Sequence, residues 1–460
     1  MKATALSLLL LLSAHSSAQT NVRSLGAAGD GVKDDTAVLQ KAISAGVGDL
    51  YFPKGTYRLT KTLEFDLTKT GVSSVSGDGT ASLLMEGPGP ALRFAGSHGG
   101  TAAPSTVNSS VWERERTPMV AGVEIVGRHP EADGIEANGT MQLTVSRVVV
   151  REARHAVHLV RRNRNVVLAD CHFYHNTGIG VFYDAVNLHQ SNITNCHISY
   201  NGGGGVVSRG GNVRNLQIGA CDIEGNHAAD GPPTANVWLD STGGSIAEVA
   251  ITGCTIQHTH KAPGSANIRL TGAGSDEGLA RRTGEGTTNE GHVTIGNNVF
   301  SDVQVNIQIQ NARGVTVTGN TFWEGFEHDL SVEKSSRIVV SGNNFDRNPR
   351  YAVNGFQGAE HNGILLRDCS EVSLTGNVIS GVLREAAAVQ ILDCRRILFN
   401  SNSIFDSDGS GLLLRNVTHS VVSGNLVRDD RPLETRSAAP GIAVVGGSAN
   451  LIEANLLQDK

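Results

Sequence analysis

Short stretches in which apolar and polar residues alternate recur along this chain at a nearly constant spacing. The repeated unit reads apolar-x-apolar-x-x-(Cys or Asn)-x-apolar, and Val166-x-Leu168-x-x-Cys171-x-Phe173 is one clear copy. Its Cys or Asn position returns about every 22 to 25 residues, with some longer intervals. Such a period predicts a solenoid, because one coil can bury its apolar face only against neighbouring coils. The residues at this position are Cys171, Cys196, Cys221, Cys254, Asn298, Asn320, Asn343, Asn377, Asn402, Asn425 and Asn455.

A further strand is predicted after each unit, beyond a turn of variable length. Its inward positions are apolar, as Val157 and Leu159 illustrate, so its outward positions should form columns along the solenoid. Stacked strands lie about 4.8 Å apart, which makes distant residues close neighbours. The predicted strands are Ala156–Val160, Gly180–Asp184, Gly205–Arg209, Asn236–Asp240, Asn267–Leu270, Asn306–Gln310, Asp329–Glu333, Gly363–Arg367, Ala388–Leu392, Leu412–Leu414 and Gly441–Val445.

These patterns predict an all-β fold, a single-stranded right-handed parallel β-helix of about 12 coils with a short N-terminal capping helix. Asp35-Thr36, followed by Ala37–Ala45 and a stop at Gly46, reads as that helix, which would cover an otherwise exposed strand edge. The predicted organisation is a signal peptide at 1–18, the cap at 19–48, first irregular coils and a loop at 49–118, and the regular β-helix at 119–460.

The N-terminus has the features of an export signal. Met1-Lys2 is basic, Ala5–Leu12 is apolar, and Ser16-Ser17-Ala18 offers small residues for cleavage. The apolar run is much shorter than the roughly 20 residues that cross a membrane. We therefore expect a secreted or periplasmic protein without a membrane span.

Composition agrees with many short strands joined by tight turns, since the chain has 55 glycines and 12 prolines. The formal charge of −6 gives no reason to expect a nucleic acid as partner. All six cysteines fall on the repeat, with Cys369 and Cys394 in a second turn column. Free, stacked thiols are predicted, although neighbouring coils are close enough for a disulfide.

The segment Val22–Thr36, together with Gln40–Ile43 and Leu50–Tyr57, resembles the N-terminal segment of the pectate-lyase-like β-helix superfamily. That superfamily includes pectate and alginate lyases, polygalacturonase-like hydrolases and phage tailspikes. The resemblance implies a polysaccharide substrate, often one that contains uronates. Asp34-Asp35 is interpreted as part of the cap rather than as a catalytic pair. The polygalacturonase runs Asn-Thr-Asp, Gly-His-Gly and Arg-Ile-Lys are absent from the coils, and one fold hosts several chemistries.

One predicted outward column contains Asp184, Arg209 and Asp240 on three successive coils. Two strand spacings separate the carboxylates by roughly 9 to 10 Å, close to the separation in inverting glycosidases. The alternative is a cross-strand salt-bridge ladder that only stabilises the sheet.

Two neighbouring columns offer groups that bind sugars. Trp238, Arg269 and Gln308 share one column, in which an indole face suits a pyranose ring and a guanidinium suits a carboxylate. The other column contains Asn236, Asn267, Asn306 and Asp329. Its oxygens are candidates for sugar hydroxyls or for Ca²⁺, and an amide ladder is the alternative.

Titratable groups also gather on adjacent turns. His258, His260 and Lys261 lie on one turn, and Glu224 and His227 lie on the turn before it. They are candidates for the base that removes a proton α to a uronate carboxyl group, with Arg269 or Arg209 neutralising that carboxylate. A solvated polar turn is the alternative, and zinc would lack a fourth ligand.

The leading hypothesis is a polysaccharide lyase that cleaves an acidic polysaccharide by β-elimination. A glycoside hydrolase that uses two of Glu224, Asp184 and Asp240 is the second, and a non-catalytic glycan-binding solenoid is the third. Oligomeric state, sugar and linkage are left open. The candidate catalytic residues are Lys261, His260, Arg269, Glu224, Asp240 and Asp184, and the candidate substrate-binding residues are Trp238, Arg209, His227, His258, Asn236, Asn267 and Gln308.

Overall fold

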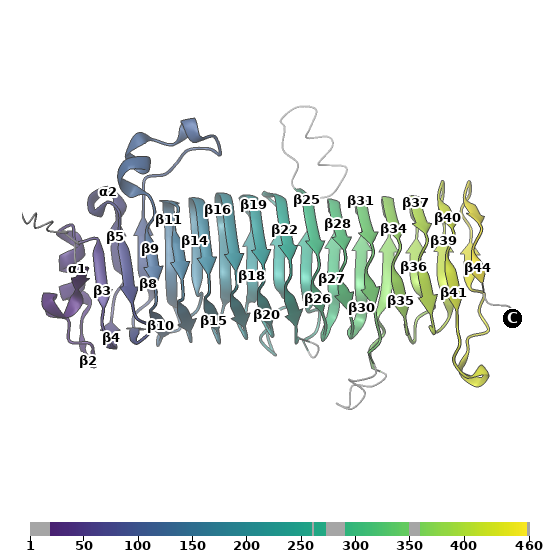
Figure 1. Cartoon of the computed structure of the whole chain (residues 1–460), viewed down its shortest axis with the longest axis horizontal. Helices are drawn as coiled ribbons and strands as arrows, with labels where there is room; N and C mark the ends of the chain where they lie inside the picture. Colours follow the sequence, from purple (N-terminus) through teal and green to yellow (C-terminus); the bar gives the residue numbers. More distant parts are fainter. Residues whose placement is uncertain (1–18, 260–261, 273–289, 349–358, 458–460) are drawn as a thin grey trace, which may run out of the picture.

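The structure is a computed structural model that describes residues 19–259, 262–272, 290–348 and 359–457. The chain forms one long solenoid of stacked parallel strands, with the N-terminal and C-terminal coils at opposite ends (Figure 1). The predicted right-handed parallel β-helix with an N-terminal capping helix is confirmed. No helix among the described residues is long and apolar enough to cross a membrane.

Each coil contributes three strands, as β18 (Gly204–Arg209), β19 (Asn212–Gly219) and β20 (Asp222–Glu224) illustrate. First and second strands belong to a 28-stranded sheet, and third strands form a 16-stranded sheet. Single residues with a left-handed backbone turn the chain between strands, for example Gly210 with φ of 69° and Ala220 with φ of 51°. These one-residue corners keep side chains in register from coil to coil.

The first strands of the other coils stack on one another in the same sheet. Three of them, β11, β14 and β16, are longer and also form the beginning or all of the second strand of their coil. The first strands of the other coils are β5 (Leu63–Asp66), β8 (Gly89–Ala95), β11 (Ala132–Met141), β14 (Val157–Ala169), β16 (Ile179–Thr194), β21 (Ala235–Asp240), β24 (Ala266–Thr271), β27 (Val303–Gln310), β30 (Gly325–Glu333), β33 (Gly363–Arg367), β36 (Ala387–Leu392), β39 (Ser410–Arg415) and β42 (Ile442–Val445).

The other second strands are β1 (Thr20–Asn21), β3 (Asp49–Phe52), β6 (Ser74–Gly77), β9 (Met119–Ala121), β12 (Thr144–Ser146), β22 (Ser245–Thr252), β25 (Glu290–Gly296), β28 (Arg313–Thr318), β31 (Ser336–Ser341), β34 (Ser370–Thr375), β37 (Arg395–Asn400), β40 (Val421–Ser423) and β43 (Leu451–Glu453). The other third strands are β2 (Asp30–Asp34), β4 (Gly55–Leu59), β7 (Ala81–Met85), β10 (Glu124–Gly127), β13 (Val149–Arg151), β15 (His172–Tyr174), β17 (His197–Ser199), β23 (Thr255–Gln257), β26 (Val299–Phe300), β29 (Thr321–Phe322), β32 (Asn344–Phe345), β35 (Val378–Ser380), β38 (Ser403–Phe405), β41 (Leu426–Arg428) and β44 (Leu456–Leu457).

The repeat position forms the predicted ladder inside the solenoid. The Asn320 side chain donates from Nδ2 to Asn343 Oδ1 at 3.0 Å, and Asn343 donates in the same way to Asn377. All six cysteines are buried and free, which confirms stacked thiols rather than disulfides. Each ladder amide also donates to a backbone carbonyl, so these buried polar groups are hydrogen-bonded.

The N-terminal cap is α1 (Thr36–Ser44), whose Leu39 and Ile43 pack into the core. The buried Asp35 carboxylate accepts hydrogen bonds from the Ala28 and Gly29 amides, and Asp34 accepts from Thr36. The structural interpretation of this acidic pair therefore agrees with its contacts. The strands before residue 119 already pair within both sheets, so the predicted number of about 12 coils is too low against a third-strand sheet of 16.

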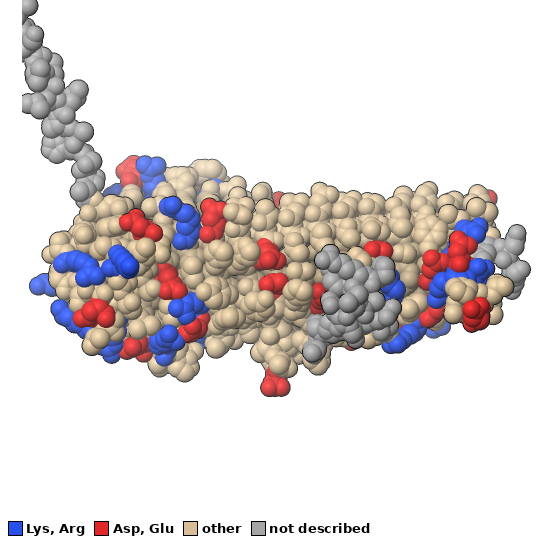
Figure 2. Space-filling view, turned by 60° about the horizontal axis from the view of Figure 1, so that its bottom comes forward, with Lys and Arg blue, Asp and Glu red and all other residues tan. Residues whose placement is uncertain are grey.

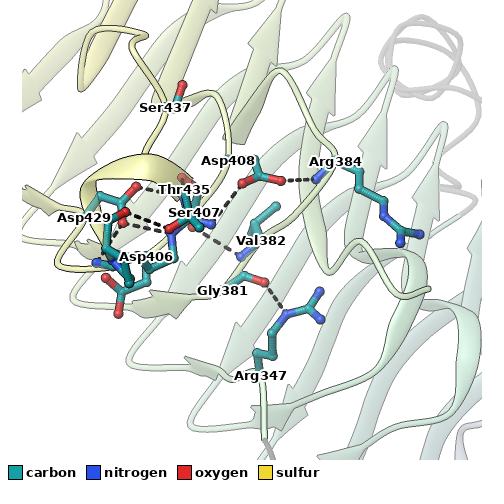
Figure 3. Close-up of polar contacts among 12 residues, drawn as sticks. Arg347, Gly381, Val382, Arg384, Asp406, Ser407, Asp408, Asp429, Thr435 and Ser437 are labelled. Carbon is teal, nitrogen blue, oxygen red and sulfur yellow. Dashed lines mark hydrogen bonds and ion pairs between the residues drawn. The ribbon is translucent and has the colours of Figure 1, made fainter. Parts of the chain in front are cut away.

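The last long turn, residues 428–441, folds around Arg431. Its guanidinium donates to Asp408 at 2.9 Å and to Asp429 at 2.7 Å. Asp408 lies in the preceding turn and also accepts from the backbone of Arg384 in the turn before that, so the three successive turns are linked (Figure 3). A cavity of about 500 Å³ lies beneath the turn.

Candidate functional site

Outward side chains of the first strands form one continuous surface, which we call the outer face. The register confirms that it has two columns, with Phe182, Val207 and Trp238 on successive strands of the first and Asp184, Arg209 and Asp240 on the same strands of the second. The full first column is Glu64, Arg93, Glu136, His158, Phe182, Val207, Trp238, Arg269, Gln308, Ser331, Leu365, Gln390, Leu413 and Ala443. From β14 onward the second is Val160, Asp184, Arg209, Asp240, Thr271, Gln310, Glu333, Arg367, Leu392, Arg415 and Val445.

At the centre of the outer face, Trp238 holds two arginines by cation–π contacts. The guanidinium carbon of Arg209 lies 4.4 Å from the indole centroid, and that of Arg269 lies 5.0 Å from it. Arg269 is buried and donates from Nε to Gln308 Oε1 at 2.7 Å. Burial, and then the charge of Arg209, lower the pKa of the Arg269 guanidinium. The indole thus orients cations instead of offering an open face to a sugar ring, and Arg209 is the exposed member of the group.

Asp184 does not form the salt-bridge ladder. Within the described ranges Arg209 makes no ion pair, and Asp184 instead lies 3.0 Å from Nε2 of His158. Asp240 accepts from the backbone of Thr242. The ladder alternative is therefore wrong, and both carboxylates remain partly exposed beside Arg209.

The His158 ring is placed by groups that the sequence did not single out. Nδ1 lies 4.0 Å from the buried carboxylate of Asp133, and the ring stacks on Phe182 at 5.2 Å between centroids. Asp133 also accepts from both Arg154 Nε and Nη2, which fixes its orientation. His158 thus lies between a buried and an exposed carboxylate. The sequence pattern places His158 in the same column as Trp238, but it does not show Asp133, which lies on β11, the coil before the first predicted strand Ala156–Val160.

The structure does not bring the candidate catalytic residues of the turns together in the way that the sequence predicted. Glu224 belongs to β20 in the other sheet, where it accepts from Tyr200 at 2.9 Å, so it does not face Asp184 or Asp240. Its pairing with either aspartate as a catalytic pair is therefore wrong. His227 is partly buried near Arg269, burial lowers its pKa, and no hydrogen-bond partner is present for either ring nitrogen. His260 and Lys261 lie outside the described residues.

His258 lies at the corner that follows β23 and contacts two acids. Its Nδ1 is 3.0 Å from Asp302 Oδ2, and its Nε2 is 3.6 Å from Glu224 Oε2. The bond to Asp302 raises the pKa of His258. Acidic side chains occupy the middle of this edge of the solenoid, whereas Lys and Arg gather toward its two ends (Figure 2).

Asp302 in turn shares a hydrogen bond with Glu324 at the next corner. Burial opposes ionisation of Asp302, but hydrogen bonds from His258 and Glu324 bring its pKa below the ordinary value. Burial and the Asp302 carboxylate raise the pKa of Glu324 to about 9. Glu324 is therefore protonated at neutral pH and Asp302 is ionised.

Asn236 and Asn267 are fully buried, so the prediction that they bind substrate is corrected. Asn236 Nδ2 donates to Asn267 Oδ1 at 2.8 Å, Asn267 donates to Asn306, and Asn306 donates to Asp329. This is an internal amide ladder that occupies the side-chain oxygens considered for Ca²⁺, except for Asp329 Oδ2. Among the described residues no group of three or more His, Cys, Asp or Glu side chains has a metal-binding arrangement.

Three protein families match parts of the chain. "Rhamnogalacturonase A/epimerase, pectate lyase-like" matches residues 19–84, "Right handed beta helix region" matches residues 119–256, and "Periplasmic copper-binding protein (NosD)" matches residues 240–459. No curated protein matches the chain.

Among solved structures, the Dettilon tailspike protein (gp208) superposes with a TM-score of 0.54 at 15% identity, over 92% of this chain and 68% of the tailspike. The A-module of the mannuronan C-5 epimerase AlgE4 from Azotobacter vinelandii gives a TM-score of 0.45 at 16% identity, over 94% of this chain and 99% of that module. At such identities the likeness concerns the fold.

The regular coils and the N-terminal segment define a class of protein, the right-handed parallel β-helix. The matches at residues 19–84 and 119–256 support the pectate-lyase-like superfamily of these β-helices.

Proposed function

We propose that the protein is an enzyme that binds an acidic, uronate-containing polysaccharide along the outer face and cleaves it by β-elimination. The observation that carries this proposal is the Arg209–Trp238–Arg269 group next to the His158–Asp184 pair. A uronate carboxylate needs a cation beside it, and the proton on its α carbon needs a base. Both kinds of group lie on neighbouring strands here, about 5 Å apart per coil.

In the proposed reaction, exposed Arg209 contacts the uronate carboxylate and stabilises the charge that develops when the α proton leaves. The His158–Asp184 pair accepts that proton. Asp184 is the partly exposed member of the pair and receives the proton, while His158, whose Nε2 lies 3.0 Å from Asp184 Oδ2 and whose Nδ1 is buried, orients the carboxylate. The electron pair of the broken C–H bond forms the new double bond, and the glycosidic oxygen leaves and is protonated from solvent.

Hydrolysis is the second candidate, because Asp184 and Asp240 lie two strands apart on the same column. The resulting spacing of roughly 9 to 10 Å leaves room for a water molecule between carboxylate and sugar. In this alternative one carboxyl group protonates the leaving oxygen and the other activates the water. Arg209, between them, would hold an acidic sugar in either reaction.

The proposal includes action outside the cytoplasm. The apolar run at Ala5–Leu12 favours export, although it lies outside the described residues. The family matched by residues 240–459 is described as periplasmic, which supports the same compartment.

A panel of uronate polysaccharides, followed by ultraviolet absorbance and by new reducing ends, tests the proposal. A lyase produces an absorbing unsaturated uronate, and Asp184→Asn should lower its kcat by about 100-fold or more. Glu371→Gln, a surface change on β34 where Glu371 pairs with Arg337, is the matched control and should leave kcat unchanged. Reducing ends without absorbance would favour hydrolysis. Binding without any product, or equal turnover in the Asp184 variant, would overturn the catalytic proposal.

A further inference from the structure

A second group of basic side chains lies away from the outer face, on the outward side of the second strands. Arg164, His189 and Arg214 are aligned on three successive coils. Arg162 starts the same stretch of β14, and His98 comes from the segment 96–118, which arches over this part of the solenoid (Figure 1). We call these five residues the arginine cluster.

Arg164 and His98 of the arginine cluster are buried, its other three members are partly buried, and several of its polar atoms have no hydrogen-bond partner. Arg164 is 5% exposed and donates from Nη1 to the Ala102 carbonyl at 2.6 Å, while its Nε has no partner. His98 is 3% exposed, and its Nε2 accepts from Arg162 Nε at 3.3 Å. The remaining ring nitrogen of His98, Nδ1, therefore carries the proton in the neutral ring, and it has no partner. Arg162 Nη2 is also buried and unpaired.

No carboxylate forms an ion pair with these five side chains within the described part of the chain. Glu115 comes close, but its two oxygens are used by the amide and the hydroxyl of Ser97 at 2.6 and 2.7 Å. Glu248, on the coil that follows Arg214, is exposed; its charge acts on Arg214 and His189, but no ion pair joins them within the described residues. Burial lowers the pKa of Arg162 and of Arg164, and it lowers the pKa of His98 to about 4.

The covering segment is held in place by its own packing. Val107 and Val111 pack on Met141 of β11 as a separate apolar cluster. Arg214 donates to Ser245 on the neighbouring coil, so its guanidinium is oriented before any ligand arrives. The unpaired N–H groups of Arg162, Arg164 and His98 lie where this segment contacts the sheet.

Buried, unpaired guanidinium groups are costly unless an anion accompanies them. Every unpaired atom of Arg162, Arg164 and His98 is a donor, so the missing partner must supply acceptors and negative charge. We propose that the arginine cluster is a binding site for an oxyanion of phosphate or sulfate size, distinct from the outer face. The ion is either free in solution or carried as an ester on a glycan.

Isothermal titration of the full chain with inorganic phosphate and with sulfate tests this site, with chloride at equal ionic strength as reference. Arg162→Gln and Arg214→Gln should each weaken phosphate binding by about tenfold or more. Arg337→Gln removes an arginine that already pairs with Glu371, and it should leave phosphate binding unchanged. Binding in the two cluster variants equal to that of the unaltered chain, or no phosphate heat beyond that of chloride, would overturn the proposal.

Thermal unfolding provides a second readout that a merely structural role would not give. Without phosphate, Arg162→Gln should unfold at about the same temperature, because it removes a partly buried charge with an unpaired Nη2 along with the hydrogen bonds to His98 and Asn187, and phosphate should no longer raise that temperature. A large loss of stability in phosphate-free buffer would contradict the site. Competition between phosphate and a sulfated oligosaccharide would identify the ester as the source, and failure to compete would identify the free ion.

Discussion

The outer face has two halves built on the same strand positions but with opposite chemistry. On β14 to β27 the first column carries His158, Trp238 and Arg269, with acids and Arg209 beside them. On β33 to β42 the same column carries Leu365 and Leu413. We call these the upstream half and the downstream half. The difference shows that the repeat determines the interior, while each outward position is free to serve chemistry or packing.

The downstream half forms a small second core on the outside of the sheet. Leu365, Leu392 and Leu413 are each 7% exposed and pack with Ala387. Apolar side chains on an outward face are excluded from water here by the turns around them, as satellite clusters commonly are. The first column of this half therefore stabilises the coils, whereas the same column of the upstream half carries His158 and Arg269.

The largest expected effect is a loss of kcat that occurs in a variant of the upstream half and not in a variant of the downstream half. His158→Gln should lower kcat by about 100-fold, because it removes the imidazole that orients the Asp184 base and that lies between Asp133 and Asp184. His419→Gln, at an exposed downstream corner, is the control. Initial rates on the polyuronate that gives turnover provide the measurement. Equal rates in the two variants would remove His158 from the site.

A substitution in the downstream half should lower the stability of the fold and leave kcat unchanged. Leu413→Ala should lower the free energy of unfolding by about 2 kcal/mol, since it opens a gap in the outer apolar cluster. Denaturant unfolding measures this loss, and kcat should stay unchanged at a temperature where the variant is folded. A fall in kcat comparable with that of His158→Gln would mean that the two halves are not separate.

A smaller effect, on the pH dependence of the free energy of unfolding, is expected for Glu324, which precedes β30 between the two halves. The folded-state pKa of Glu324 is raised from 4.5 to about 9, so its stabilisation is present below pH 4.5 and is lost as pH rises toward 9. Glu324→Gln keeps a neutral side chain at all pH values. At pH 8 it should therefore be more stable than the unaltered chain, by on the order of 1 kcal/mol. The two proteins should match near pH 4, and a stability difference that does not change with pH would contradict the shared proton.

The sequence predicted the fold well because the interior repeats. Alternating apolar positions and the Cys or Asn ladder residue give both register and spacing, so the outward columns of Asp184 and Trp238 followed correctly. The site was predicted less well, because its contacts depend on side-chain conformations that the repeat does not determine. Trp238 was expected to face a sugar, but arginines lie next to it on both neighbouring coils and its indole faces attract their charge.

Turn residues were the least predictable part. Glu224 ends a third strand and the chain then turns a corner, so closeness in sequence to His227 does not bring it to the outer face. Asn236 looks outward by strand alternation, yet it lies at the strand start, where the turn folds over it and the amide ladder buries it. Asp133 and Phe182 join His158 only once the coils are stacked.

The most direct test compares two arginines in one column. Arg209 lies in the upstream half and Arg415 occupies the equivalent place in the downstream half, and both are exposed. Affinity for an acidic oligosaccharide should fall about tenfold or more in Arg209→Gln and should be unchanged in Arg415→Gln. Equal losses in both variants, or no loss in Arg209→Gln, would contradict binding on the upstream half of the outer face.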